Sequence, residues 1–152
     1  MLASCSAAAL FMLTITAEFI YAKSATELSA AVPLTIAQGV VRIPVSTVND
    51  GMLHRFSIQS DGTTIRIIAI QRPDQSIAIA FDACRICGSQ GYYQSGRNVM
   101  CKNCASAINI PTVGQQGGCN PIPLASSVQG EQIVIAADNL LAEGSKLFGG
   151  SR

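Results

Sequence analysis

The amino-acid sequence is poor in the residues that bind nucleic acids or perform acid–base catalysis. Its 152 residues include no tryptophan, a single histidine and only 5% aromatic residues, and the formal net charge is +1. Without a basic surface, and with few rings to stack on bases, the chain is a poor candidate for a nucleic-acid binder. It also lacks a nucleophile–base set at a recognisable spacing, a P-loop and a dinucleotide fingerprint. We therefore expect that the protein is not an enzyme.

Charged residues are scarce as well, at 12% of the chain, about half the usual share. Much of the apolar excess lies in residues 2–22, where Glu18 is the only charge. This run is about long enough to cross a bilayer as one helix. Three interpretations stay open: a retained membrane helix, a signal peptide cleaved before Ala25 at a small-residue site, or a helix buried in a homo-oligomer such as a filament.

The apolar run sets the expected compartment of the rest of the chain. We divide the sequence into a hydrophobic N-terminal helix at residues 1–35, acting as anchor, signal or assembly helix, and an extracytoplasmic domain at residues 36–152. We expect this domain on the outer side of the cytoplasmic membrane. If the N-terminal segment is processed, we expect a secreted or cell-surface protein instead.

The chain beyond Pro33 has the pattern of short strands. Alternating or β-branched segments separated by turn clusters predict an antiparallel meander of four strands, at residues 40–45, 53–58, 63–71 and 76–81. Further elements are a hairpin around Ser95-Gly96, a strand at residues 131–136, and a short helix from Asp138 as N-cap to Gly144 at its end. The predicted fold class is mainly β: a compact antiparallel domain with a cysteine-rich loop region, preceded by one long hydrophobic helix.

The cysteines carry most of the chemical information. Cys84 and Cys87 form one C-x-x-C pair, Cys101 and Cys104 form a second, and Cys119 stands alone in a Gly-Gly-Cys-Asn-Pro turn. Two such pairs about a dozen residues apart have the spacing of a tetrathiolate metal site. Cys119 is a fifth ligand, a replacement for one of the four, a ligand to a second metal, or an inert buried thiol.

Disulfides and thiol chemistry are the alternatives to a metal. Outside the cytoplasm, paired cysteines are ordinarily read as disulfides. Without Cys5 of the apolar run, however, five cysteines remain, so pairing leaves one over. A C-x-x-C pair is also a tight ring for a structural disulfide and is more usual in redox or metal sites. Thiolates suit zinc, Cu(I) and iron–sulfur centres, so we expect a metal ion or metal–sulfur centre of iron, copper or zinc.

His54 is a further candidate ligand. Strand alternation puts its side chain on the same face as Phe56 and Ile58. A histidine in that position is either a hydrogen-bonded core residue or a metal ligand.

Three motifs together resemble a known family. They are the two C-x-x-C pairs, G-Y-x-Q-x-G at residues 91–96, and G-G-C-N-P-x-P-L at residues 117–124. Over most of residues 40–140 the chain resembles the core of a bacterial family of predicted membrane, Fe–S-membrane-protein-like domains of unknown function. Its members carry this domain outside the cytoplasmic membrane and are often encoded beside high-affinity iron permeases and thioredoxin-like proteins.

The resemblance implies metal handling, with a membrane, an iron permease or a thioredoxin-like redox protein as partners. The candidate metal ligands are Cys84, Cys87, Cys101, Cys104, Cys119 and His54. We expect a membrane-anchored extracytoplasmic protein that handles or reduces iron or copper in metal transport or electron transfer. The alternatives are a structural or filament subunit whose metal only stabilises the fold, and a thiol–disulfide redox protein.

Overall fold

The computed structural model describes residues 30–150. The long hydrophobic helix expected at residues 1–35 therefore falls almost entirely outside the described residues. Within residues 30–150, the structure contains no helix with the length and hydropathy of a membrane span.

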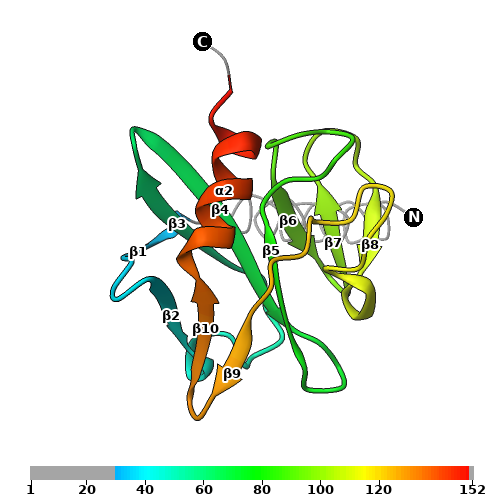
Figure 1. Cartoon of the computed structure of the whole chain (residues 1–152). Coiled ribbons are helices and arrows are strands. Elements are labelled where there is room, and N and C mark those ends of the chain that lie inside the picture. The colour runs from blue at the N-terminus through cyan, green and yellow to red at the C-terminus, as the bar shows by residue number, and fades with distance from the viewer. Residues whose placement is uncertain (1–29, 151–152) are drawn as a thin grey trace, which may run out of the picture.

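The central sheet has the strand order β1-β3-β4-β5 (Figure 1). Its members are β1 (Val32–Leu34), β3 (His54–Ser60), β4 (Thr63–Gln71) and β5 (Ile77–Phe81). Strands β3, β4 and β5 form the antiparallel meander expected from the sequence. Strand β1 was not expected, because Pro33 interrupts the pattern there. It pairs parallel to β3 at the edge of the sheet, where a proline is tolerated.

A second antiparallel sheet has the order β2-β10-β9, made of β2 (Val40–Pro44), β9 (Ser127–Gln129) and β10 (Gln132–Ala136). The prediction that the strand at residues 40–45 joins the meander was wrong, because β2 pairs with β10 instead of β3. The segment from β2 to β3 contains the 3-10 helix η1 (Val45–Thr47), so it is too long for a tight hairpin. Val41 and Ile43 are instead fully buried opposite Ile135 and Ile133.

A third antiparallel sheet, β6-β7-β8, stands on the other side of the central sheet (Figure 1). It consists of β6 (Tyr92–Ser95), β7 (Asn98–Cys101) and β8 (Ala107–Asn109), followed by the 3-10 helix η2 (Ile110–Thr112). The hairpin expected around Ser95-Gly96 is confirmed, because Ser95 pairs with Asn98. The three-residue strands β8 and β9 were too short to be predicted from periodicity.

The helix α2 (Ala137–Phe148) is longer than expected. Its N-cap is Ala136, and Asp138 lies in the first turn, where a negative charge stabilises the helix dipole. The prediction that Gly144 ends the helix was wrong. A Cβ on this glycine would lie 2.7 Å from the Ile65 side chain, so Gly144 lets α2 pack closely on β4.

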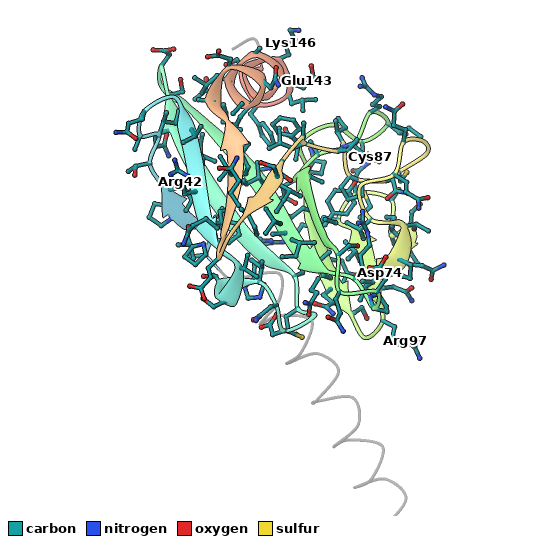
Figure 2. The ribbon with its side chains drawn as sticks, turned by 60° about the horizontal axis from the view of Figure 1, so that its bottom comes forward. Arg42, Asp74, Cys87, Arg97, Glu143 and Lys146 are labelled. Carbon is teal, nitrogen blue, oxygen red and sulfur yellow. The ribbon has the colours of Figure 1, made fainter. Side chains whose placement is uncertain are left out.

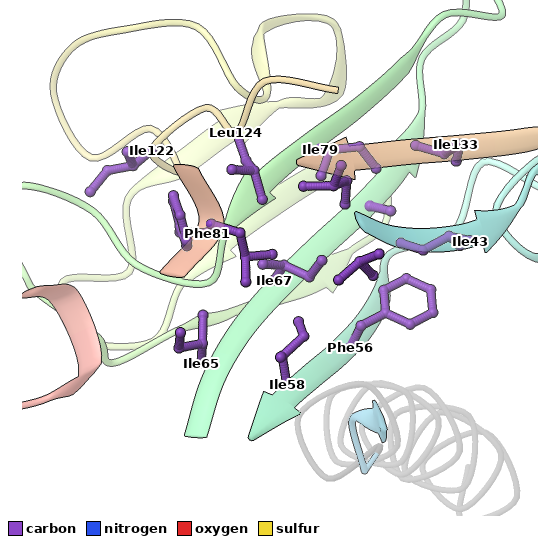
Figure 3. Close-up of a cluster of buried hydrophobic side chains, with 14 of the residues drawn as sticks. Ile43, Phe56, Ile58, Ile65, Ile67, Ile79, Phe81, Ile122, Leu124 and Ile133 are labelled. Atoms are coloured by element: carbon purple, nitrogen blue, oxygen red, sulfur yellow. The ribbon is translucent and has the colours of Figure 1, made fainter. Parts of the chain in front are cut away.

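Two hydrophobic cores lie on opposite faces of β4 and β5. Ile65 and Ile67 of β4 belong to the first core, which also includes residues of β2, β3, β10 and α2 (Figure 3). Ile68 and Ile70 of the same strand belong to the second core, with Tyr92, Val99 and the buried Cys84 and Cys101. Burial on both faces explains the nearly unbroken apolar run in β4. Cys84 and Cys101 therefore belong to the wall of the second core, and Cys87 and Cys119 pack against it.

Candidate metal centre

The first cysteine pair forms a tight turn, which we call the first knuckle (residues 84–88). The Cys84 amide donates to the Gly88 carbonyl at 3.1 Å, and the Gly88 amide donates back at 2.9 Å. The Cys87 amide donates to the Cys84 sulfur at 3.0 Å. Gly88 has a φ of +66°, a conformation that glycine adopts without steric cost. This turn places both sulfurs on the same side of the loop.

The second knuckle (residues 101–105) follows directly from β7. The Ala105 amide donates to the Cys101 carbonyl, and the Cys101 amide donates to the Ser106 carbonyl, both at 3.0 Å. Ala105 occupies the position of Gly88 and also has a positive φ, of +56°. The Lys102 amide donates to the Gly91 carbonyl at 3.0 Å, which ties this knuckle to the start of β6.

Cys119 reaches the same place from a third loop. The Tyr92 hydroxyl donates to the Cys119 carbonyl at 2.7 Å. Immediately after this loop, the Ile122 amide donates to the Ala83 carbonyl at 3.0 Å, and the Phe81 amide donates to the Ile122 carbonyl at 2.8 Å. The loop that carries Cys119 is therefore fastened beside the strand end that carries Cys84.

These five residues, which we call the cysteine cluster, form two overlapping groups of sulfur atoms. In the first group, the sulfurs all lie within 4.8 Å of one another, and its members are Cys84, Cys87 and Cys119. The second group meets the same limit, and its members are Cys87, Cys101 and Cys104. Cys87 belongs to both, and the sulfurs of Cys104 and Cys119 are 3.4 Å apart. The structure thus distributes the two C-x-x-C pairs over two groups and includes Cys119 in one of them.

All five cysteines of the cluster are free thiols. The alternative of structural disulfides is therefore not realised among the described residues. Figure 2 shows Cys87 on the side of the ribbon away from Arg42 of β2, among the loops that connect the third sheet.

His54 is not part of either group. Its Nε2 lies 2.8 Å from Oδ1 of Asp50, and this hydrogen bond lowers the pKa of Asp50. The structure does not bring His54 together with the cysteines.

The cysteines of the cluster differ in burial. Cys84 and Cys101 form its buried floor, and Cys104 and Cys119 form its more exposed rim. Cys84 and Cys101 are both 2% exposed. Burial raises the pKa of Cys101 to about 11. Burial is also the largest single effect on Cys84, but hydrogen bonds from the backbone amides of Cys87 and Ile86 and the Tyr92 side chain together lower the pKa of this thiol. The two buried cysteines therefore differ. Cys101 loses its proton only at high pH, whereas backbone amides stabilise the thiolate of Cys84.

The rim consists of Cys104 and Cys119. Cys104 is exposed, and its sulfur is hydrogen-bonded to the Ser106 hydroxyl at 3.3 Å. The hydroxyl and the amide of Ser106 lower the pKa of Cys104 to about 6. Ser106 also favours the Cys119 thiolate, but the neighbouring Cys104 and burial outweigh it and raise the pKa of Cys119. At neutral pH, Cys104 is therefore mainly a thiolate and Cys119 mainly a protonated thiol.

A buried carboxylate that the sequence analysis missed positions the first knuckle. Asp82 is 3% exposed; its Oδ1 accepts from the Tyr92 amide at 2.8 Å, and its Oδ2 accepts from Nε of Arg66 at 3.3 Å. Arg66 also donates to the Ser89 carbonyl and lies over the Phe148 ring, 5.0 Å from its centroid. The signal in the sequence was a charged residue directly between an apolar strand and a C-x-x-C pair.

Gly91 is the neighbour that makes room for this carboxylate. Its φ is +88°, and a Cβ there would lie 2.8 Å from Oδ2 of Asp82. The glycine in the G-Y-x-Q-x-G motif therefore permits the backbone to approach Asp82 closely.

A cleft of about 520 Å³ lies beside the cysteine cluster. It runs between the first knuckle and the Cys119 loop, and its walls include Arg85, Ile86, Asn120 and Glu143. Ile86 is 69% exposed at its edge. The cleft borders the chain segments on either side of Cys119 and between Cys84 and Cys87, but no cysteine side chain lines it.

The family comparison agrees with this arrangement. A family model described as membrane iron-sulfur containing protein FtrD-like matches residues 48–148. The chain belongs to this FtrD-like family. The match includes all five cysteines of the cluster and confirms the resemblance seen in the sequence motifs. No curated protein and no solved structure matches the chain.

Proposed function

We propose that the domain binds iron through the thiolates of the cysteine cluster and transfers iron or electrons to a partner protein outside the cytoplasmic membrane. The observation that carries this proposal is the convergence of five free sulfurs from three separate loops. A fold that only needed to close its loops would not require five thiols at one place. The family description, which names iron–sulfur and membrane proteins, favours iron over copper or zinc.

The donor set fits a thiolate-bound metal. Thiolates bind a four-coordinate ion at about 2.3 Å, which puts neighbouring sulfurs about 3.8 Å apart in a tetrahedron. The sulfurs within each group lie inside 4.8 Å of one another, which is compatible with that spacing. The described residues bring no histidine or carboxylate into either group, so the donors are uniformly soft. When bound, an iron or iron–sulfur group supplies one-electron redox chemistry.

The residues around the sulfurs would tune that chemistry. The Cys87 amide already points at the Cys84 sulfur, and hydrogen bonds to thiolates raise the reduction potential by stabilising the reduced, more negative state. Tyr92, which is 1% exposed, excludes water from the floor. Cys104 at the exposed rim offers the side from which a partner reaches the centre.

The partners follow from the family resemblance and belong to the same proposal. An iron permease would receive iron from the centre, and a thioredoxin-like protein would maintain its thiols in the reduced state. Both interactions require that the domain lies outside the cytoplasmic membrane, with residues 2–22 as its anchor. The role requires no hydrolysis or group transfer.

Anaerobic purification of the full chain tests the proposal. We expect bound iron by elemental analysis, with thiolate-to-metal absorption that changes reversibly on reduction. A variant combining Cys84→Ser with Cys101→Ser should lose metal and absorption, whereas Cys5→Ser, in the apolar run, should retain both. A colourless zinc that neither exchanges nor changes on reduction would show that the metal only stabilises the fold.

Thiol–disulfide exchange is a second candidate, because the sulfurs of Cys104 and Cys119 lie 3.4 Å apart at the rim. Here the Cys104 thiolate attacks a disulfide of a partner protein, forming a mixed disulfide and releasing one partner thiolate. Cys119 then attacks the Cys104 sulfur and releases the second partner thiolate, so the partner gains two electrons and the rim becomes a disulfide. Reduction of insulin disulfides by the metal-free protein, abolished by Cys104→Ser, would favour this candidate. If the metal-free protein does not reduce insulin disulfides, only the metal-binding proposal remains.

A further inference from the structure

We propose that the cysteine cluster holds two metal ions that share the thiolate of Cys87. Cys84 and Cys119 complete the first site, and Cys101 and Cys104 complete the second. This inference rests on the proposed function, because it requires that the cluster binds metal at all.

The grouping of the sulfurs supports two sites better than one. A four-coordinate ion accepts at most four of the five thiolates, so a single site leaves one cysteine unused. Cys84 belongs to one group and Cys101 to the other, so each group contains one of the two buried sulfurs. Each group is compact enough to surround one ion, and Cys87 is the sulfur common to both. A thiolate sulfur has lone pairs enough to bind two ions.

The contact between Cys104 and Cys119 joins the two groups a second time. Their sulfurs are 3.4 Å apart, although one belongs to each group. Because Cys87 lies within 4.8 Å of both rim sulfurs, the sulfurs of Cys87, Cys104 and Cys119 form a compact triangle that belongs partly to each group. Two ions inside such an arrangement would be close neighbours.

Charge balance also favours a second cation. Five thiolates carry five negative charges. One divalent ion therefore leaves three negative charges uncompensated, and two divalent ions leave one. Uncompensated charge is costly at buried sulfurs, and Cys84 and Cys101 are each 2% exposed. The nearby Arg85 is poorly placed to help, because its side chain is 77% exposed and lies 4.0 Å from Glu143. A second divalent ion would compensate most of the remaining charge.

Cadmium titration of the reduced, metal-free full chain in detergent tests this inference. Cadmium binds thiolates and gives an ultraviolet thiolate-to-metal absorption band, and native mass spectrometry counts the ions. We expect two Cd²⁺ per chain for the wild type and for the Cys5→Ser control. Cys119→Ser should retain only the second site and Cys104→Ser only the first, so each should bind one ion. Circular dichroism of each variant checks that the fold survives.

Cadmium-113 NMR tests the shared ligand itself. Two resonances coupled to each other through one sulfur are expected for the wild type, and Cys87→Ser should abolish the coupling. A wild-type chain that binds a single ion, or two ions without coupling, would overturn the inference and leave the proposed function standing. A wild-type chain that binds no cadmium would remove both.

Discussion

The two faces of β4 and β5 support two regions that are held together in different ways. The apolar region, built around the first core from β1 to β5, β9, β10 and α2, supplies thirteen of the sixteen buried hydrophobic residues of that core. The cysteine region, residues 82–124, shares a second core of only ten, two of which are cysteines. Its strands β6, β7 and β8 have three or four residues each, and such short strands are marginally stable alone.

The difference shows where each region obtains its stability. Burial of a large aliphatic side chain contributes about 1.5–3 kcal/mol. The apolar region buries enough such side chains to be stable without a metal. A loop-rich region with few buried side chains commonly needs a metal or disulfides to hold it. Because the five thiols of the cluster are free, we infer that metal binding stabilises the cysteine region.

The largest expected effect comes from a cavity in the apolar region. Ile67 is fully buried in the first core, and Ile67→Ala should lower the free energy of unfolding by about 3 kcal/mol, with or without metal. Cys101→Ser should lower it in both metal states, because it puts a hydroxyl in the second core, but by more in the metal-loaded protein. Denaturant titrations of both variants in the two metal states measure this. Equal losses for Cys101→Ser with and without metal would mean that the cysteine region does not depend on metal.

The next effect concerns the close approach of Gly91 to Asp82. Gly91→Ala should destabilise the protein by about 2 kcal/mol, because the new Cβ would meet Oδ2 of Asp82 at 2.8 Å and φ is +88°. Gly96→Ala is the matched control, since Gly96 also has a positive φ, of +55°, but has nothing within 4 Å of a Cβ. We expect about 1 kcal/mol there. Equal losses in thermal unfolding would show that Asp82 has no steric role.

The next prediction compares the alkylation rates of Cys104 at the rim and Cys101 at the floor of the cluster. The pKa of Cys104 is about 6 and that of Cys101 about 11, and only the thiolate reacts with iodoacetamide. As the pH rises from 5 to 7, the Cys104 thiolate fraction in the metal-free protein rises from about a tenth to about nine-tenths. Alkylation of Cys104 should rise in proportion and then level off, while that of Cys101 should still be rising above pH 9. Peptide mass spectrometry measures both; identical pH profiles would contradict the difference.

The smallest effect compares the two knuckles. Gly88 and Ala105 both have positive φ, so Gly88→Ala should destabilise the metal-loaded protein by about 1 kcal/mol. Ala105→Gly should relieve strain and stabilise it by about 0.5 kcal/mol. Thermal unfolding measures both changes. A loss of stability in Ala105→Gly would mean that the second knuckle does not keep this conformation.

The sequence predicted those features that depend on short-range patterns. The β-branched run of β4, the turns that bound it and the β6–β7 hairpin have local signals, and so do the two C-x-x-C turns. The pairing of β2 with β10 and the place of Gly144 inside α2 have none, because both depend on packing between segments far apart in the chain. The C-x-x-C spacing likewise indicated four ligands around one point. It could not show that Cys119 lies 3.4 Å from Cys104, because the turn at Gly117 and the contact with Tyr92 determine that placement.

Amide hydrogen exchange in the presence and absence of metal is the most direct test of the difference between the two regions. On removal of metal from the full chain, we expect faster exchange at the amides of Cys87, Lys102 and Ala105, which are hydrogen-bonded within the cysteine region. The amides of β4 in the apolar region should retain their protection. Unchanged exchange in the cysteine region, or an equal loss of protection in β4, would contradict the conclusion that metal holds the one region and apolar packing the other.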